Sequence, residues 1–217
     1  MDRVVFFDVD GTLTAAGTSS TGAFLAALKG DEAQVVAAEA AYARGELTNR
    51  QVCDVDAAGF AGLPTHRVEE WLESVPLVDG IAAVVDHCRR RDWLPVLTSL
   101  AWTVVTEHLA QRFGFALSGG PVLGVVDGAF TGGVGRYWDE HDKRDAALAV
   151  AAAHGVTPAR CFALGDSRSD LPLFAAVGGA VAVNASAECV AAASTSLTTQ
   201  DLADTIPLLD DLAASGC

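Results

Sequence analysis

The sequence predicts an α/β fold, with a doubly wound and mainly parallel sheet, a small α-helical domain and a β-hairpin. Two patterns predict this class. Short apolar runs, typical of strands, alternate along the chain with amphipathic runs of helical period. Strands that alternate with helices form parallel sheets with helices on both faces. The chain has 217 residues, 51% of them hydrophobic and 19% charged, which suits one sizeable core, or one core with a small accessory domain.

Four runs are predicted to be the strands of this sheet. The first, residues 3–7, is an apolar run, which indicates a strand buried on both faces. The predicted strands are residues 3–7, 94–98, 160–164 and 180–183. The predicted helices of the sheet's two faces are residues 80–91, 101–113, 143–154 and 170–177.

Two segments depart from this alternation. Residues 14–79 carry helical patterns only, and they follow the first strand directly. We therefore expect them to cover the active end of that strand as a cap. Residues 121–134 contain two apolar runs around Asp127-Gly128, the pattern of a tight hairpin. The predicted domains are a core of residues 1–13 and 80–217 and a helical cap of residues 14–79.

Polar residues follow the predicted strands at their carboxyl ends. Asp8 and Asp10 follow the first strand, Ser99 the second and Asp166 the third. In doubly wound sheets, ligands bind beyond the carboxyl ends of the strands. We therefore expect these side chains to meet in one site.

The residues of this site suit phosphoryl transfer. A phosphate monoester is anionic and hydrolyses slowly, so an enzyme must neutralise charge, position a nucleophile and protonate the leaving alcohol. Asp8 is the predicted nucleophile, which forms an aspartyl-phosphate, and Asp10 is the predicted general acid and base. Mg²⁺ prefers oxygen ligands. Its predicted ligands are the carboxylates of Asp8 and Asp166 and the backbone carbonyl of Asp10.

Two further residues are predicted to hold the phosphoryl group. Lys143 compensates the negative charge of the site, and Ser99 donates a hydrogen bond to a phosphate oxygen. The neighbouring Thr98 is the alternative donor. Lysines are mostly surface residues, so the role of Lys143 rests on the order of the motifs rather than on its residue type.

The run Asp8-Val9-Asp10-Gly11-Thr12-Leu13-Thr14 resembles the first motif of the haloacid dehalogenase superfamily of phosphohydrolases. Ser99, Lys143 and residues 165–170 resemble its second, third and fourth motifs, in that order. The arrangement is similar to the phosphoserine phosphatase-like branch, which has a small helical cap between the first two motifs. The resemblance implies a magnesium-dependent phosphatase in which Asp170 orients Lys143 or a metal-bound water.

The substrate of that branch fits this sequence poorly. In phosphoserine phosphatases a glutamate shortly after the first motif binds the substrate's amine, and a cap arginine binds its carboxylate. Here residues 15–21 contain no acid, and the arginine's position falls at Asp56. A carboxylate there would repel that of phosphoserine. We expect a small neutral or cationic phosphomonoester, such as a phosphorylated sugar, polyol or amino alcohol, with phosphoserine as the alternative. The predicted substrate contacts are Thr98, Asp56 and Arg168.

Other functions are weighed against this one. A phosphomutase or phosphotransferase passes the phosphoryl group to a second alcohol instead of water. A signalling receiver domain also places an aspartate, a hydroxyl and a lysine around Mg²⁺, but it lacks a counterpart of Asp10 and an inserted cap. A binding module without activity would have lost Asp8 or Asp10, and this chain has both.

Composition restricts the partners and the compartment. The formal net charge of −14 disfavours nucleic acid, and the one basic run, residues 89–91, falls at the end of a predicted helix. No apolar stretch is long enough to span a bilayer, and no secretory signal precedes the first strand. The five cysteines are scattered, as reduced thiols are. We expect a cytoplasmic protein that acts on a small molecule, while its oligomeric state is not predicted.

Overall fold

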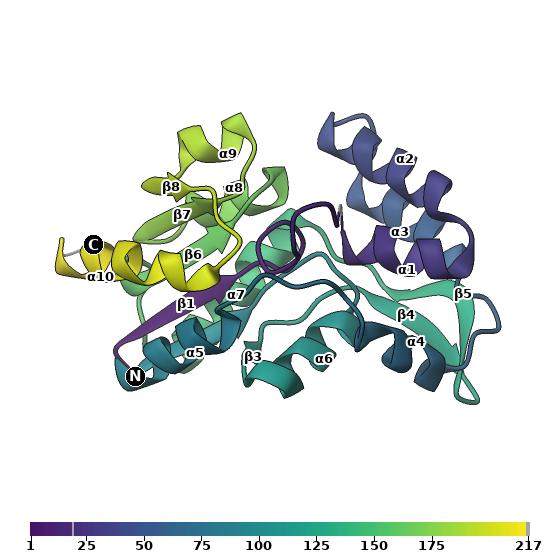
Figure 1. Cartoon of the computed structure of the whole chain (residues 1–217), viewed down its shortest axis with the longest axis horizontal. Helices are drawn as coiled ribbons and strands as arrows, with labels where there is room; N and C mark the ends of the chain where they lie inside the picture. The colour runs from purple at the N-terminus through teal and green to yellow at the C-terminus, as the bar shows by residue number, and fades with distance from the viewer. Residues whose placement is uncertain (19, 216–217) are drawn as a thin grey trace.

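The computed structural model describes residues 1–18 and 20–215, so Ser19 and the last two residues, Gly216 and Cys217, lie outside the described part. Its centre is a six-stranded sheet whose neighbouring strands are all parallel (Figure 1). In spatial order the strands are β3 (Ala116–Leu117), β2 (Trp93–Leu97), β1 (Arg3–Phe7), β6 (Cys161–Gly165), β7 (Gly179–Val183) and β8 (Thr195–Leu197). This confirms the predicted class.

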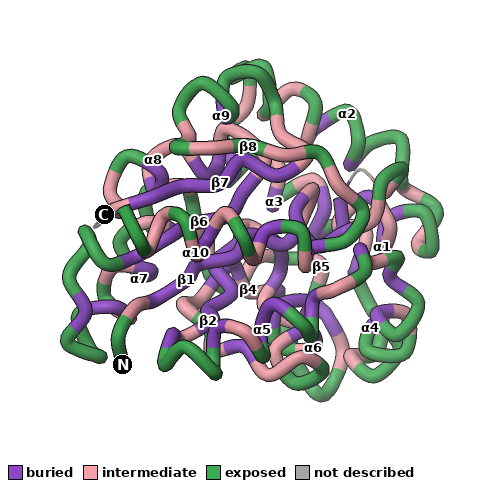
Figure 2. The backbone as a smooth tube through the Cα atoms, turned by 60° about the vertical axis from the view of Figure 1, so that its left-hand side comes forward, coloured by how far each residue is buried: buried purple, intermediate pink, exposed green. Residues whose placement is uncertain are grey.

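Helices cover both faces of the sheet, because alternate side chains of β1 enter different cores. Val5 and Phe7 pack with α5 (Ile81–Arg90), α6 (Thr103–Phe113) and α10 (Ile206–Ala214). Val4 and Phe6 pack with α7 (Glu140–Ala153), α8 (Leu171–Phe174) and α9 (Ala187–Ala192) on the other face. All four β1 side chains are fully buried, as the apolar run predicts, and Figure 2 shows the buried strands at the centre.

The predicted elements differ from the observed ones mainly at their ends. The strands β3 and β8 were not predicted, because two or three residues at a sheet edge give no clear apolar pattern. Helix α7 begins at Glu140 rather than at residue 143, since the Asp139 side chain accepts hydrogen bonds from the backbone of His141 and Asp142. The predicted helix 170–177 is shorter, because a 3₁₀ turn (Arg168–Asp170) precedes α8.

A helical insert separates β1 from α5, as predicted. It comprises α1 (Thr21–Lys29), α2 (Glu32–Ala43), α3 (Asn49–Ala58) and α4 (Thr65–Leu72). The two segments that join it to the core run side by side, because the Val78 N–H donates to the carbonyl of Leu13 and the Ala15 N–H to that of Pro76. The insert therefore leaves and re-enters the core at one place, directly beyond β1.

The predicted hairpin consists of β4 (Val122–Val126) and β5 (Ala129–Arg136). It is bound to the helical insert: the Gly62 N–H donates to the carbonyl of Phe130, and the Phe130 N–H to that of Leu63. The rings of Phe60 and Phe130 also meet edge to face, with centroids 5.5 Å apart. The hairpin thus lies beside the insert, although it follows the second motif in the sequence (Figure 1).

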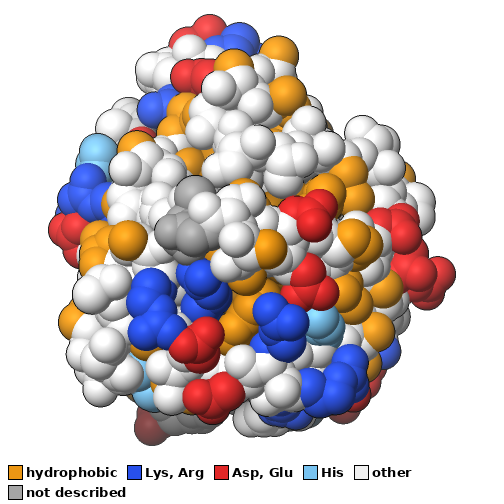
Figure 3. All heavy atoms as spheres, turned by 90° about the vertical axis from the view of Figure 1, so that its left-hand side faces the viewer, with side chains coloured by type: hydrophobic (Ala, Val, Ile, Leu, Met, Phe, Trp, Pro, Cys, Tyr) orange, Lys and Arg blue, Asp and Glu red, His pale blue; other side chains and the backbone are white. Residues whose placement is uncertain are grey.

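Charges on the surface are mixed. Arg89 and Arg91, at the end of α5, lie 4.0 Å and 3.6 Å from Asp86 and Asp210 respectively. Figure 3 shows basic and acidic side chains interspersed in the same way over one face. Within residues 1–18 and 20–215, every helix is too short or too polar to cross a membrane.

Candidate active site

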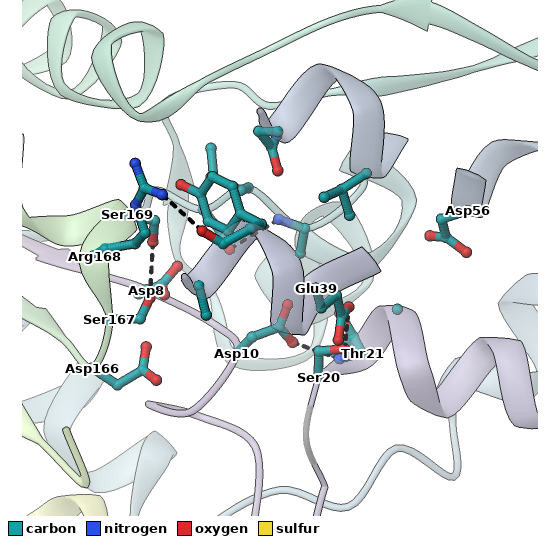
Figure 4. A pocket seen from close by; sticks show the side chains of 18 of the residues that line it. Asp8, Asp10, Ser20, Thr21, Glu39, Asp56, Asp166, Ser167, Arg168 and Ser169 are labelled. Carbon is teal, nitrogen blue, oxygen red and sulfur yellow. Dashed lines mark hydrogen bonds between the residues drawn. The ribbon is translucent and has the colours of Figure 1, made fainter. Parts of the chain in front are cut away.

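The candidate site lies where the order of the sheet reverses, between β1 and β6. The chain runs from β1 outward to β3 and then returns through β6 on the other side of β1. Asp8 follows β1, and its backbone N–H donates to the carbonyl of Leu164 in β6. Beyond these strand ends lies a cavity of about 330 Å³, lined by Asp8, Asp10 and Asp166 from the core and by residues of the insert (Figure 4).

Lys143 joins the nucleophile candidate to the fourth motif. Its Nζ lies 3.0 Å from Asp8 Oδ1 and 2.6 Å from Asp170 Oδ1, and its side chain is fully buried. Burial alone would lower the pKa of Lys143, but the carboxylates of Asp170 and Asp8 outweigh it and hold that pKa above its ordinary value. This ammonium group therefore stays charged in the site.

Asp170 fixes the loop after β6. Its Oδ2 accepts hydrogen bonds from the backbone N–H groups of Asp166 and Ser167, at 3.0 Å and 3.2 Å. Gly165 allows this approach, because a Cβ there would lie 2.2 Å from the Asp170 carboxyl carbon. The carboxylate thus positions Lys143 with one oxygen and the Asp166 backbone with the other.

The carboxylates of Asp8, Asp166 and Asp170 suit a hard cation. One oxygen from each lies within 4.8 Å of the others. Burial, with repulsion from Asp8 and Asp170, raises the pKa of Asp166. A divalent cation would relieve that repulsion, so the residues fit the predicted Mg²⁺. The backbone carbonyl of Asp10 was also predicted to be a Mg²⁺ ligand. The grouping of carboxylates does not test that prediction, because it concerns side chains only.

Asp10 points toward the insert rather than into this carboxylate group (Figure 4). Its Oδ1 accepts a 2.6 Å hydrogen bond from the backbone N–H of Thr21, at the start of α1. Burial raises the pKa of Asp10 to about 6, although the hydrogen bond from Thr21 opposes that rise. A carboxyl group with this pKa exchanges protons near neutral pH, as a general acid and base must.

The structure brings Ser99 to the cavity and turns Thr98 away from it. Ser99 lines the cavity, and its Oγ accepts a hydrogen bond from the Ala101 N–H. The Thr98 hydroxyl instead donates to the backbone carbonyl of Lys143 at 3.4 Å. Of the two predicted phosphate donors, this geometry favours Ser99.

Glu39 is a cavity residue that the sequence analysis missed. It lies on α2, and its Oε1 accepts a 2.6 Å hydrogen bond from the Ser20 hydroxyl. Burial raises the pKa of Glu39 to about 7, and the charges of Asp10 and Asp56 add to the effect. No pattern in the sequence predicts its place there, because a glutamate in a helix is usually on the solvated face.

Asp56, a predicted substrate contact, lines the cavity but has protein partners for both oxygens. Its Oδ1 lies 2.7 Å from the Nζ of Lys29, and its Oδ2 accepts a 2.6 Å hydrogen bond from the indole N–H of Trp102. The side chains of Asp56 and Lys29 are 6% and 1% exposed. The negative charge on which the argument against phosphoserine rested is therefore compensated within the insert.

Arg168, the third predicted substrate contact, also lines the cavity. Its guanidinium donates a 2.7 Å hydrogen bond to the backbone carbonyl of Tyr42 and lies 3.5 Å from Glu140. It also covers the ring of Tyr42, with 4.7 Å between the guanidinium carbon and the ring centroid. These contacts join the fourth motif to the end of α2.

Comparison with known proteins places the chain in a family. The family model of haloacid dehalogenase-like hydrolases matches residues 5–175. The chain belongs to this family of hydrolases, which confirms the family resemblance predicted from the sequence.

Several relatives and solved structures are phosphoserine phosphatases. That of Streptomyces coelicolor is 33% identical over 184 residues, which are 84% of this chain and 44% of that protein. That of Halobacterium salinarum is 31% identical over 183 residues, covering 83% of this chain and 85% of that protein. A substrate-bound phosphoserine phosphatase structure has a TM-score of 0.85 at 20% identity, covering 96% of this chain and 98% of that one. The chain spans less than half of the length of the Streptomyces coelicolor protein.

The raised pKa values of the buried acids predict that the metal-free protein loses stability as pH rises. Asp10 and Glu39 release protons near pH 4 when unfolded but only near 6 and 7 when folded. Between these values the folded state binds more protons, so deprotonation destabilises it. Thermal unfolding after chelation should give a Tm about 5 °C or more lower at pH 8 than at pH 5.

Mg²⁺ is expected to raise Tm more at pH 8 than at pH 5, because its ligands must be ionised. As a control for the metal-free series, Glu39→Gln should reduce the decrease in Tm across this pH range. A metal-free Tm that increases from pH 5 to pH 8 would contradict the raised pKa values.

Proposed function

We propose that this protein hydrolyses a small phosphomonoester by transferring its phosphoryl group to Asp8, with Mg²⁺ as cofactor. One observation supports this most: the Asp8 carboxylate faces the cavity 3.0 Å from the buried ammonium group of Lys143. A fixed cation there orients the Asp8 carboxylate and compensates the charge of the incoming phosphate. When bound by Asp8 and Asp166, Mg²⁺ would supply further positive charge at the phosphoryl oxygens.

In the proposed reaction, an oxygen of Asp8 attacks phosphorus and the bond to the leaving alcohol breaks. Asp10, with its pKa of about 6, would give a proton to the leaving oxygen. Lys143 and Ser99 would hold the phosphoryl oxygens throughout. Asp10 would then accept a proton from the water that attacks the aspartyl-phosphate, which releases inorganic phosphate and restores Asp8.

The proposed leaving alcohol is neutral or cationic and carries no carboxylate. Glu39 supports this, because it lies on the insert side of the cavity and no described Lys or Arg is within 4.0 Å of it. Figure 4 shows Glu39 close to Ser20 and Thr21, the turn that also binds Asp10. Asp10 would contact the leaving oxygen of the ester. A substituent of the alcohol close to that oxygen would therefore lie near the carboxyl group of Glu39.

Phosphoserine is the second candidate, favoured by the relatives that are phosphoserine phosphatases. Its amine could bind Glu39, but its carboxylate would need a cation. Among the described residues that line the cavity, Arg168 is the one basic side chain, and it is already bound to Tyr42 and Glu140. The carboxylate would also enter a cavity that Glu39 makes more negative.

A panel of esters tests the substrate class. With Mg²⁺, we expect kcat/KM for phosphoethanolamine or glycerol phosphate to exceed that for phosphoserine by at least about tenfold. Release of inorganic phosphate measures turnover, and Asp8→Asn is the matched blank. Added alcohols should not divert the phosphoryl group, which separates a hydrolase from a phosphotransferase.

Two results of this panel have different meanings. A kcat/KM that is highest for phosphoserine would contradict the proposed substrate class while keeping the reaction. If no ester is hydrolysed faster than by Asp8→Asn, the reaction itself is wrong.

Glu39→Gln tests the residue on which the substrate class rests. The amide keeps the size of the side chain and a partner for Ser20, but it removes the charge. We expect kcat/KM for a cationic ester to fall about tenfold and that for a neutral ester to change less than about twofold. The loss should be larger at pH 8 than at pH 6, because the pKa of Glu39 is about 7.

Glu32→Gln is the matched control, since this exposed residue lies on the same helix. The substitution Glu32→Gln should leave kcat/KM for the cationic and the neutral ester unchanged. An equal loss for the neutral and the cationic ester in Glu39→Gln would show that Glu39 does not select charge.

A further inference from the structure

Trp102 and Asp56 join the insert to the core across the cavity wall. Asp56 belongs to α3 of the insert, whereas Trp102 is the residue that precedes α6 of the core. The indole N–H donates to Asp56 Oδ2 at 2.6 Å, and both side chains are buried. A hydrogen bond to a carboxylate in such surroundings is stronger than one between neutral groups.

Lys29 holds Asp56 in place and favours its charged form, which opposes the rise in the pKa of Asp56 caused by burial. Its Nζ lies 2.7 Å from Asp56 Oδ1, 3.2 Å from the Asp56 backbone carbonyl and 3.5 Å from the centre of the Phe60 ring. Asp31 faces the same ammonium group at 3.7 Å. All these residues belong to the insert, so the carboxylate is fixed there whether or not it meets Trp102.

Trp102 is coupled to the residues that would hold phosphate. It lies three positions after Ser99, and the intervening Ala101 donates its backbone N–H to the Ser99 hydroxyl. Trp102 and Asp56 both line the cavity. The position of the indole therefore depends on the insert at one end and on the Ser99 loop at the other.

We propose that Asp56, Lys29 and Trp102 form a closing contact that holds the insert over the cavity and positions the Ser99 loop. In this proposal Asp56 is a positioning residue and not a ligand of the substrate. Opening the cavity must break the Trp102 hydrogen bond and expose the Lys29–Asp56 pair. The proposal does not depend on which ester is hydrolysed.

A second link between insert and core, from Arg168 to the Tyr42 carbonyl, is less suited to this role. Figure 4 shows Arg168 and Asp56 on different sides of the pocket. The Arg168 side chain is 32% exposed, so solvent screens its interactions, whereas Asp56 is 6% exposed. The closing contact is therefore better shielded from solvent than the link through Arg168.

Cys53 provides a direct readout of opening. It lies on α3, lines the cavity and is 5% exposed. The thiol is shielded in the closed structure and burial raises the pKa of Cys53 to about 12, so opening of the cavity should speed its reaction with thiol reagents. Cys88, which is fully buried in the core, reports global unfolding in the same experiment.

The experiment measures labelling of both thiols by N-ethylmaleimide in the whole 217-residue chain with Mg²⁺, using mass spectrometry of peptides. Trp102→Phe keeps the ring and removes the N–H donor. We expect Cys53 to be labelled about tenfold faster, with the rate at Cys88 unchanged. Trp71→Phe, in α4 and outside the closing contact, should behave as the parent does.

Two double variants test the contact from the insert side. Lys29→Met with Asp56→Asn removes the buried charges but keeps an oxygen acceptor for the indole. The labelling rate of Cys53 should therefore be closer to the parental rate than it is in Trp102→Phe. Lys29→Met with Asp56→Leu removes the acceptor, and Cys53 in this variant should be labelled as fast as in Trp102→Phe. If Trp102→Phe does not fold, this second double variant decides the question.

Parental labelling of Cys53 in a folded variant that lacks the donor or the acceptor would overturn the proposal. Faster labelling of Cys53 and Cys88 by the same factor would also overturn it, because the residues would then stabilise the whole fold and not the closed cavity.

Discussion

The site depends on one buried cation among carboxylates. The Lys143 ammonium group contacts Asp8 and Asp170, and Asp170 in turn binds the backbone of the loop that carries Asp166. Removing one partner of such a group leaves an uncompensated buried charge, which costs several kcal/mol. The chain positions Lys143 by starting α7 early, at Glu140, so that the lysine falls on its buried face. The strand ends, this helix and Gly165 are therefore parts of one electrostatic arrangement.

The proposed chemistry and the proposed selectivity lie on different elements. The core supplies Asp8, Lys143 and Asp166 at the ends of strands and the start of a helix, where little can move. The insert supplies Glu39 from α2, and it is joined to the core by two short segments and by backbone hydrogen bonds to the hairpin. Substitutions in the insert can therefore change the leaving alcohol without disturbing the phosphoryl site.

The sequence predicted the catalytic side of the molecule better than the insert. Strand-end residues such as Asp8 and Asp166 are predictable because parallel strands bring their carboxyl ends together, whatever the side chains nearby. Glu39 and the partners of Asp56 depend on how short alanine-rich helices pack, and helical periodicity does not determine that packing. The same limit applies to the hairpin. Its two strands were predicted correctly, but no pattern in the sequence predicts its backbone hydrogen bonds to the insert. The roles of the site residues remain predictions.

Direct detection of a phosphoryl group on Asp8 tests the central claim most directly. The protein would be mixed with Mg²⁺ and the best ester of the panel, quenched with acid within a single turnover, digested and analysed by mass spectrometry. We expect a phosphorylated peptide that contains Asp8, formed in the parent and absent from Asp8→Asn. Turnover of the ester with no phosphorylated peptide at any quench time, or with the phosphoryl group on another residue, would contradict it.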